Sequence, residues 1–184
     1  MKKISYFICT AIFLGFVLFI SCGRKNNSDQ LQKIDSLIVV LDELEKKIQT
    51  IDTAKIGEIY RVCNADLVFI QKNYKDTMDR ELAIFLSDYH ALKKSSTRLM
   101  ESIVDQDYEI GYSKNQLKNL KLDLNNDLYN EDLFAEYFNS EQSAIEKMDE
   151  TIQNTISWYQ NAIQMFDTNS VKVKAIISDL KNEK

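Results

Sequence analysis

The sequence predicts an all-α protein, an elongated, antiparallel, coiled-coil-like helical bundle of about five helices with a long C-terminal helix. Its 184 residues include no proline and only 4 glycines, so few positions could interrupt a helix. Over most of the chain, apolar residues recur at alternating steps of three and four, which is the spacing of a heptad seam. The connections between these segments are short, and we therefore expect consecutive helices to pack antiparallel.

Three helices are expected in the first part of the chain, over residues 29–50, 54–74 and 77–107. Each has a stripe of apolar side chains: Ile34, Leu37, Leu41, Leu44, Ile48 and Ile51 in the first; Ile56, Tyr60, Cys63, Leu67, Ile70 and Tyr74 in the second; Met78, Leu82, Phe85, Tyr89, Leu92, Leu99 and Ile103 in the third. The pairs Asp52-Thr53 and Asp76-Thr77 offer N-cap side chains where the second and third helices begin.

A short fourth helix is expected over residues 114–128, after a loop that ends at Gly111. Ser113 and Gln116 have the spacing of a capping box, in which the two side chains bond to free backbone amides at a helix start. The inward side chains of this helix are leucines: Leu117, Leu120, Leu124 and Leu128.

The fifth helix should begin near Asn130 and be the longest. Its main apolar residues lie seven positions apart, which indicates a left-handed supercoil: Ile145, Ile152, Tyr159, Phe166, Val173 and Leu180. Residues 167–170 are poor helix formers, but the repeat keeps its frame across them, so we expect the helix to continue. Fifty residues of helix would span roughly 75 Å.

The N-terminus has the features of a secretory signal. Two lysines precede an apolar run from Ile4 to Ile20, and the small residue Ser21 comes directly before Cys22. The run is almost long enough for a transmembrane helix. The basic residues that follow it, Arg24 and Lys25, would then lie on the wrong side of the membrane, which favours a cleaved signal.

The segment Leu18-Phe19-Ile20-Ser21-Cys22 resembles the lipobox of bacterial lipoproteins, although leucine is usual where this chain has Phe19. The resemblance implies a signal peptide over residues 1–21, cleavage between Ser21 and Cys22, and a diacylglycerol and palmitate anchor on Cys22. It also implies a tether over residues 22–30 and a single helical domain over 31–184. Gly23 is not the aspartate that often retains such proteins in the inner membrane, which implies an outer membrane location in the cell envelope if there is one. Beyond the lipobox, the chain resembles other all-helical envelope lipoproteins in class only.

Charge and cysteine content narrow the possible functions. The formal net charge is −5, which disfavours nucleic acid as a partner and broad binding to anionic lipid surfaces. Of the 3 cysteines, Cys9 lies in the signal and Cys22 would carry the lipid, so Cys63 has no disulfide partner within the mature chain. Because Cys63 lies on an apolar helical face, we expect a buried structural thiol rather than a reactive one.

No set of residues predicts a catalytic, cofactor or metal site. Residues 123–127 resemble the start of a calcium-binding loop, but the glycine and glutamate that such a loop needs are replaced by Leu128 and Phe134. His90 is the single histidine, so neither a di-metal bundle nor a c-type haem site is indicated. We expect no metal, no cofactor and no enzymatic activity.

The fifth helix has a wider apolar surface than one neighbouring helix could cover. Either the other helices surround it, or part of it binds a partner. A possible partner-facing stripe consists of Tyr137, Trp158, Met165, Ile176 and Ile177.

The expected function is a non-catalytic adaptor, scaffold or inhibitor. It would be held at the membrane through Cys22 and would bind another envelope protein or a second copy of itself. The alternative is a helical-bundle carrier whose cavity for a small ligand would be lined by aromatic residues: Tyr60, Tyr74, Phe85, Tyr89 and Phe166.

Overall fold

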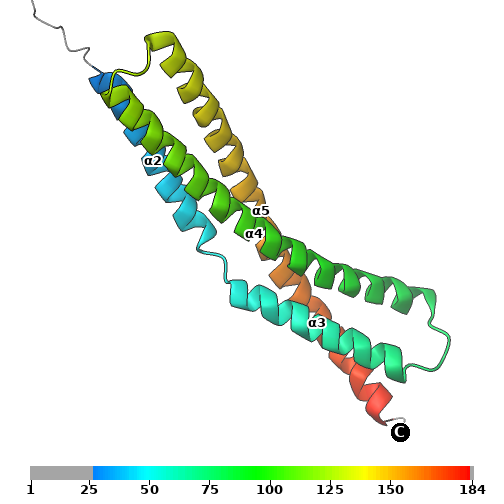
Figure 1. The fold of residues 1–184 in the computed structure, drawn as a ribbon. Helices are drawn as coiled ribbons and strands as arrows, with labels where there is room; N and C mark the ends of the chain where they lie inside the picture. Colours follow the sequence, from blue (N-terminus) through cyan, green and yellow to red (C-terminus); the bar gives the residue numbers. More distant parts are fainter. Residues whose placement is uncertain (1–26, 183–184) are drawn as a thin grey trace, which may run out of the picture.

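The computed structural model describes residues 27–182 and confirms the all-α fold. The described part contains four helices and no strand: α2 (Ser28–Ile48), α3 (Thr53–Asn73), α4 (Arg80–Asn125) and α5 (Glu131–Asn182). α2 and α3 follow one another along the molecule, α4 returns antiparallel to both, and α5 runs antiparallel to α4 (Figure 1). The molecule is therefore an elongated three-helix bundle in which one of the three members is interrupted.

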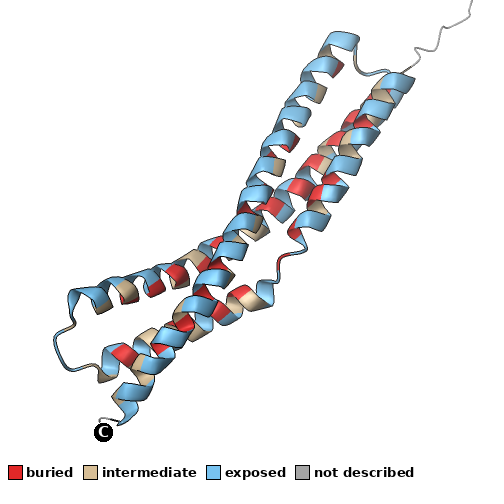
Figure 2. Cartoon of the chain, turned by 180° about the vertical axis from the view of Figure 1, so that it is seen from behind, coloured by how far each residue is buried: buried red, intermediate tan, exposed pale blue. Residues whose placement is uncertain are grey.

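Two hydrophobic clusters lie end to end along the bundle, and α4 and α5 contribute to both. The first cluster joins α2 and the first turn of α3 to one end of α4 and α5, with the buried residues Ile34, Leu41, Leu44, Ile48, Ile51, Ile56, Leu99, Ile110, Leu117, Leu120, Leu124, Phe134, Ile145, Met148 and Ile152. The second joins α3 to the other end, with Ile59, Cys63, Ile70, Leu86, Tyr89, Leu92, Ala162, Phe166 and Val173. We call residues 28–51 with 100–150 the proximal half and residues 52–99 with 151–182 the distal half. The buried stripe runs through both halves (Figure 2).

The expected third and fourth helices are one continuous helix, so the prediction of a loop at Gly111 was wrong. The alternation of three- and four-residue steps continues through this region, but two of the seam residues, Gln106 and Ser113, are polar and interrupt the apolar pattern. Both are buried in the structure. Ser113 is therefore not an N-cap, and Gln116 donates a hydrogen bond to the Tyr112 hydroxyl instead of closing a capping box. A glycine inside a helix costs only about 1 kcal/mol relative to alanine, which packing on both sides can offset.

The prediction of one long C-terminal helix is confirmed, because α5 has 52 residues and spans roughly 78 Å. It passes through residues 167–170 without a break. There the side-chain hydroxyl of Thr168 donates to the carbonyl of Gln164 at 2.9 Å, and that of Ser170 donates to the carbonyl of Asp167 at 3.3 Å. Each hydroxyl thus bonds to a carbonyl of α5 itself. The low helix propensity of these residues therefore does not end the helix.

The first helix begins one residue earlier than the expected residue 29, because α2 starts at Ser28. The Asn27 side-chain amide donates to the carbonyl of Leu124 at 2.9 Å, which holds the start of α2 against the end of α4. The expected signal peptide, Ser21 and Cys22 lie outside the described residues. Within residues 27–182, no helix combines the length and the apolar composition needed to cross a membrane.

The bundle bends near its middle, where α2 ends and α4 changes direction (Figure 1). In α4 the hydroxyls of Ser95 and Ser96 both donate to the carbonyl of Leu92, at 2.8 Å and 3.0 Å. Hydroxyls that bond back to a preceding turn commonly bend a helix. These hydroxyls thus account for a bend in α4, which lies beside the interruption between α2 and α3.

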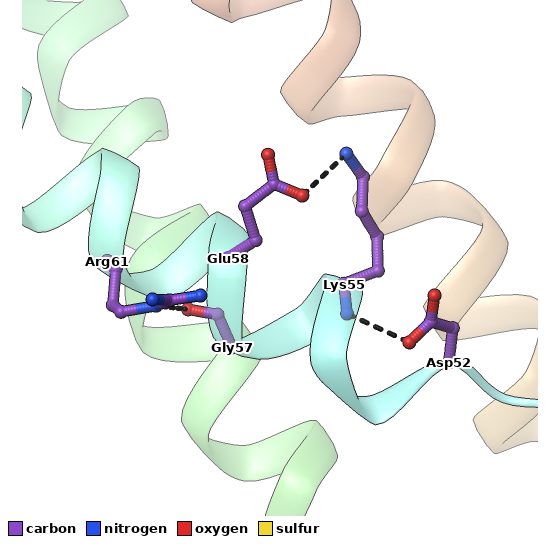
Figure 3. A network of polar contacts seen from close by, with 5 residues as sticks. All are labelled: Asp52, Lys55, Gly57, Glu58 and Arg61. Carbon is purple, nitrogen blue, oxygen red and sulfur yellow. Dashed lines mark hydrogen bonds and ion pairs between the residues drawn. The ribbon is translucent and has the colours of Figure 1, made fainter.

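Polar side chains organise the start of α3 (Figure 3). Asp52 accepts a hydrogen bond from the Lys55 backbone amide at 3.0 Å, and the Lys55 ammonium pairs with Glu58 at 3.0 Å. One turn further, Arg61 donates to the carbonyl of Gly57 at 3.2 Å. Asp52 is thus the N-cap that the sequence predicts, and it restarts the interrupted member of the bundle.

Replacing Asp52 with alanine should lower the free energy of unfolding by about 1 kcal/mol, because α3 would lose its N-cap acceptor. Chemical denaturation followed by circular dichroism would measure this. The matched control is Asp52→Asn, which keeps a capping oxygen and should remain close to the parent protein. Equal losses in both variants would show that the cap contributes nothing.

Candidate interaction surface

Three of the five residues of the expected stripe on α5 are exposed: Tyr137 at 49%, Trp158 at 36% and Met165 at 44%. The other two, Ile176 and Ile177, are half-buried against the second cluster. Their assignment to a partner-facing stripe is therefore corrected, because they fill the space between α5 and the helices beside it. The exposed stripe ends before the last turns of α5.

The part of α5 that carries Trp158 and Met165 has almost no charged side chains. Between Thr151 and Val171 the only ionisable residue with a formal charge at neutral pH is Asp167, although 28% of all residues are charged. Eight of its exposed residues lie on one side of the helix, and we call them the central α5 face: Thr151, Asn154, Ser157, Trp158, Asn161, Gln164, Met165 and Thr168. The centres of protein interfaces are depleted in charge and enriched in aromatic residues and methionine. The central α5 face shares the depletion in charge, and its two large apolar side chains, Trp158 and Met165, are of the enriched types.

Tyr137 belongs to a different part of the surface. It lies 21 residues before Trp158, which is roughly 32 Å along the helix. Its ring packs against Tyr129 in the α4–α5 connection, with 5.5 Å between ring centroids. Tyr137 thus supports that connection, and only Trp158 and Met165 remain as large apolar side chains of the central α5 face.

An open groove of about 750 Å³ lies between α2 and the start of α5, at the proximal end. Phe134, Phe138 and Leu37 supply apolar surface, while Lys33 and Glu131 lie among its polar lining residues. The aromatic residues expected to line a cavity do not surround this groove. Tyr89 and Phe166 are buried in the second cluster, and Tyr60, expected in the seam, is 41% exposed because Ile59 takes the buried position.

A buried polar group links α3 and α4 in the distal half. The Tyr89 hydroxyl donates to the Asp66 carboxylate at 2.9 Å, and Cys63 is fully buried beside Tyr89. Burial raises the pKa of the Cys63 thiol and of the Tyr89 hydroxyl, so both groups are neutral at physiological pH. The prediction of a buried structural thiol is confirmed, and this cluster lacks the exposed thiolate of a reactive cysteine.

A second polar layer, which the apolar pattern did not predict, lies between α4 and α5 where the two halves meet. The Gln106 amide donates to the hydroxyls of Ser102 and Thr155, each at 2.7 Å. Gln106 is only 3% exposed, and its carbonyl oxygen has no hydrogen-bond partner in the described chain. A polar residue in a seam can fix the register of two helices, and its position in the three-and-four pattern was the signal that could have identified it.

Glu141 occupies a seam position of α5 and faces Ser113 on α4. Burial raises the pKa of the Glu141 carboxyl, and a hydrogen bond from the Ser113 hydroxyl offsets part of that shift. Because the folded pKa exceeds the unfolded one, ionisation of Glu141 destabilises the fold. The stability that the protonated Glu141 carboxyl contributes is therefore lost as pH rises above the ordinary pKa of 4.5 for this group.

Replacing Glu141 with glutamine should raise the melting temperature at neutral pH, because the amide cannot ionise. At a pH below the ordinary pKa of the carboxyl, the variant and the parent should melt together. Thermal melts across this pH range test the expectation, with Glu150→Gln at an exposed position of the same helix as the control. A gain that persists unchanged in acid would contradict the assignment.

The described residues contain no group of three or more metal-ligating side chains close enough to hold an ion. Asp123, at the start of the segment that resembles a calcium loop, accepts a hydrogen bond from the Tyr129 hydroxyl at 3.1 Å. That segment is the end of α4, which turns at Asp127 with a positive φ of 55°. Comparisons with protein-family models, with curated proteins and with solved structures find no match to this chain, so the functional argument rests on its surfaces.

Proposed function

We propose that this protein is a non-catalytic interaction module of the bacterial envelope, held at the membrane by lipid on Cys22, which binds another protein through the central α5 face. The observation that carries the proposal is the exposed, charge-depleted face around Trp158 and Met165. A helix in a soluble bundle normally presents charged residues to water. An exposed face with this composition instead suits burial against a second protein surface.

The position of the N-terminus supports such a role. The described chain begins at Asn27, beside the α4–α5 connection at the proximal end (Figure 1). Asn27 lies five positions after Cys22, which allows a reach of at most ~18 Å. Lipid on Cys22 would thus hold the proximal end close to the membrane, and the central α5 face would begin roughly 30 Å further along α5.

Site-directed photocrosslinking tests this proposal in the native membrane with the full chain. A photoreactive side chain at Asn161 should give one adduct of defined mass, which Trp158→Ser should remove. Glu43, an exposed residue on α2, provides the matched control position. No adduct at Asn161, or the same adducts from Glu43, would overturn the proposal.

The lipid anchor requires its own measurement. Metabolic labelling with a palmitate analogue should mark the parent chain, and Cys22→Ser should abolish both the label and membrane retention. A Cys63→Ser variant is the control, because Cys63 is buried in the bundle. An unlabelled parent chain would refute lipidation while leaving the central α5 face to be tested separately.

A second candidate function, a carrier of small apolar ligands, is favoured by the groove between α2 and α5. Its volume lies within the range of small-molecule sites, and Phe134 and Phe138 provide ring contacts within it. Native mass spectrometry of the chain purified from its membrane should then detect a bound molecule. A Phe138→Ser variant should lose that molecule, and an empty parent chain would refute the carrier role.

A further inference from the structure

A second exposed apolar surface lies on α4, in the proximal half and on a different helix from the central α5 face. Val104 is 65% exposed, Tyr108 is 73% exposed and Tyr112 is 55% exposed. These side chains are four residues apart, so they form one row along the helix surface. We call this row the α4 tyrosine ridge. An isolated exposed tyrosine is ordinary, whereas three large side chains in one row make a surface that a neighbour could cover.

Exposed carboxylates lie on and beside the α4 tyrosine ridge. They are Glu101, Asp105, Asp107 and Glu109. Between Arg98 and Lys114 there is no basic residue in the sequence. None of the four carboxylates forms an ion pair with another described residue, and they belong to no group that could chelate a metal. Their charge is therefore available to a partner from outside the chain.

The negative charge extends through the whole proximal half. Residues 28–51 and 100–150 contain 18 acidic and 7 basic residues, whereas residues 52–99 and 151–182 contain 9 acidic and 11 basic residues. The net charge of the proximal half is thus strongly negative, whereas that of the distal half is slightly positive. Such a field attracts cationic molecules to one half and repels anionic ones from it.

We propose that the α4 tyrosine ridge binds a cationic amphipathic helix of another protein. A row of side chains at four-residue spacing packs into the grooves of a second helix. Lysine or arginine residues beside the apolar stripe of that helix would reach the flanking carboxylates and the tyrosine rings. The charge argues against an anionic membrane surface at the same place, because two negative surfaces repel each other.

This inference is independent of the central α5 face, so different substitutions test the two surfaces. The probe is a fluorescent amphipathic helical peptide of leucine and lysine, measured by anisotropy against the full chain in non-ionic detergent. The double variant Tyr108→Ser, Tyr112→Ser should weaken binding about tenfold or more, as loss of tyrosine anchors does at other interfaces. The double variant Asp105→Asn, Glu109→Gln should weaken binding and reduce its dependence on salt concentration.

Three controls decide the result. The same peptide with glutamate in place of lysine should not bind, and Trp158→Ser should leave binding of the lysine peptide within about twofold, as expected for sites that share no partner. Circular dichroism should show unchanged helix content, since all four substituted side chains, those of Tyr108, Tyr112, Asp105 and Glu109, are exposed. Undiminished binding by the tyrosine variant, equal binding of the glutamate peptide, or an equal loss in Trp158→Ser would overturn the proposal.

Discussion

A proline in place of Gly111 should lower the free energy of unfolding by about 3 kcal/mol or more, because α4 is continuous through this position. Proline has no amide hydrogen, and its ring would collide with the carbonyl of the preceding turn. The reason is not lack of room, since, apart from its two chain neighbours and the nearby backbone of its own helix, no described atom lies within 4 Å of the place where a Cβ would stand at Gly111. Denaturant unfolding followed by circular dichroism measures the change.

The control at the same position is Gly111→Ala, which should raise the free energy of unfolding by about 0.5–1 kcal/mol, because alanine favours the helix and meets no neighbour. Together, the proline and alanine substitutions distinguish a helix from a loop at Gly111. If the chain formed a loop at Gly111, as the sequence alone suggested, proline would be tolerated and alanine would bring no gain. That outcome would contradict a single α4.

Replacing Leu117 with alanine should lower the free energy of unfolding by about 3 kcal/mol, because its buried side chain would leave a cavity in the first cluster. Leu117 has no exposed surface, and it belongs to the cluster in which α4 packs with α2 and α5. The same denaturation experiment measures the loss.

Leu122 provides the matched control on the same helix, because it is 59% exposed. Leu122→Ala should change the free energy of unfolding by no more than about 0.5 kcal/mol. Equal effects at the two positions would show that the described core is wrong. A large loss confined to Leu117 would support the packing of α4 between its neighbours.

The heptad pattern was enough to predict the class, the shape and the long last helix, because few residues in this chain oppose helix formation. It did not reveal that α4 is continuous, because the buried seam residues Gln106 and Ser113 are polar. Between Ile103 and Leu117 the buried seam therefore retains only one apolar residue, Ile110, which is too little to indicate a helix. The frame of three- and four-residue steps, followed without regard to polarity, predicts the observed helix.

The candidate surfaces were only partly predictable. Trp158 and Met165 were expected on the outer side of the last helix, and they are exposed. Ile176 continues the buried seam, so its position in the frame could have excluded it from the stripe. The α4 tyrosine ridge was not predicted. Tyr108 can be assigned to the exposed side only if α4 is known to be one continuous helix through this region. Surface assignments of this kind fail wherever the helix boundaries are wrong.

The sharing of α4 and α5 by both clusters determines how the molecule should respond to heat. Neither cluster is complete without helices that also pack in the other one, in contrast to an array of separate repeats. We therefore expect a single cooperative thermal transition, with the same midpoint whether it is observed from the proximal or the distal half. Binding of a ligand at one end of the bundle, or a destabilising change there, would then shift the melting temperature that is observed at the opposite end.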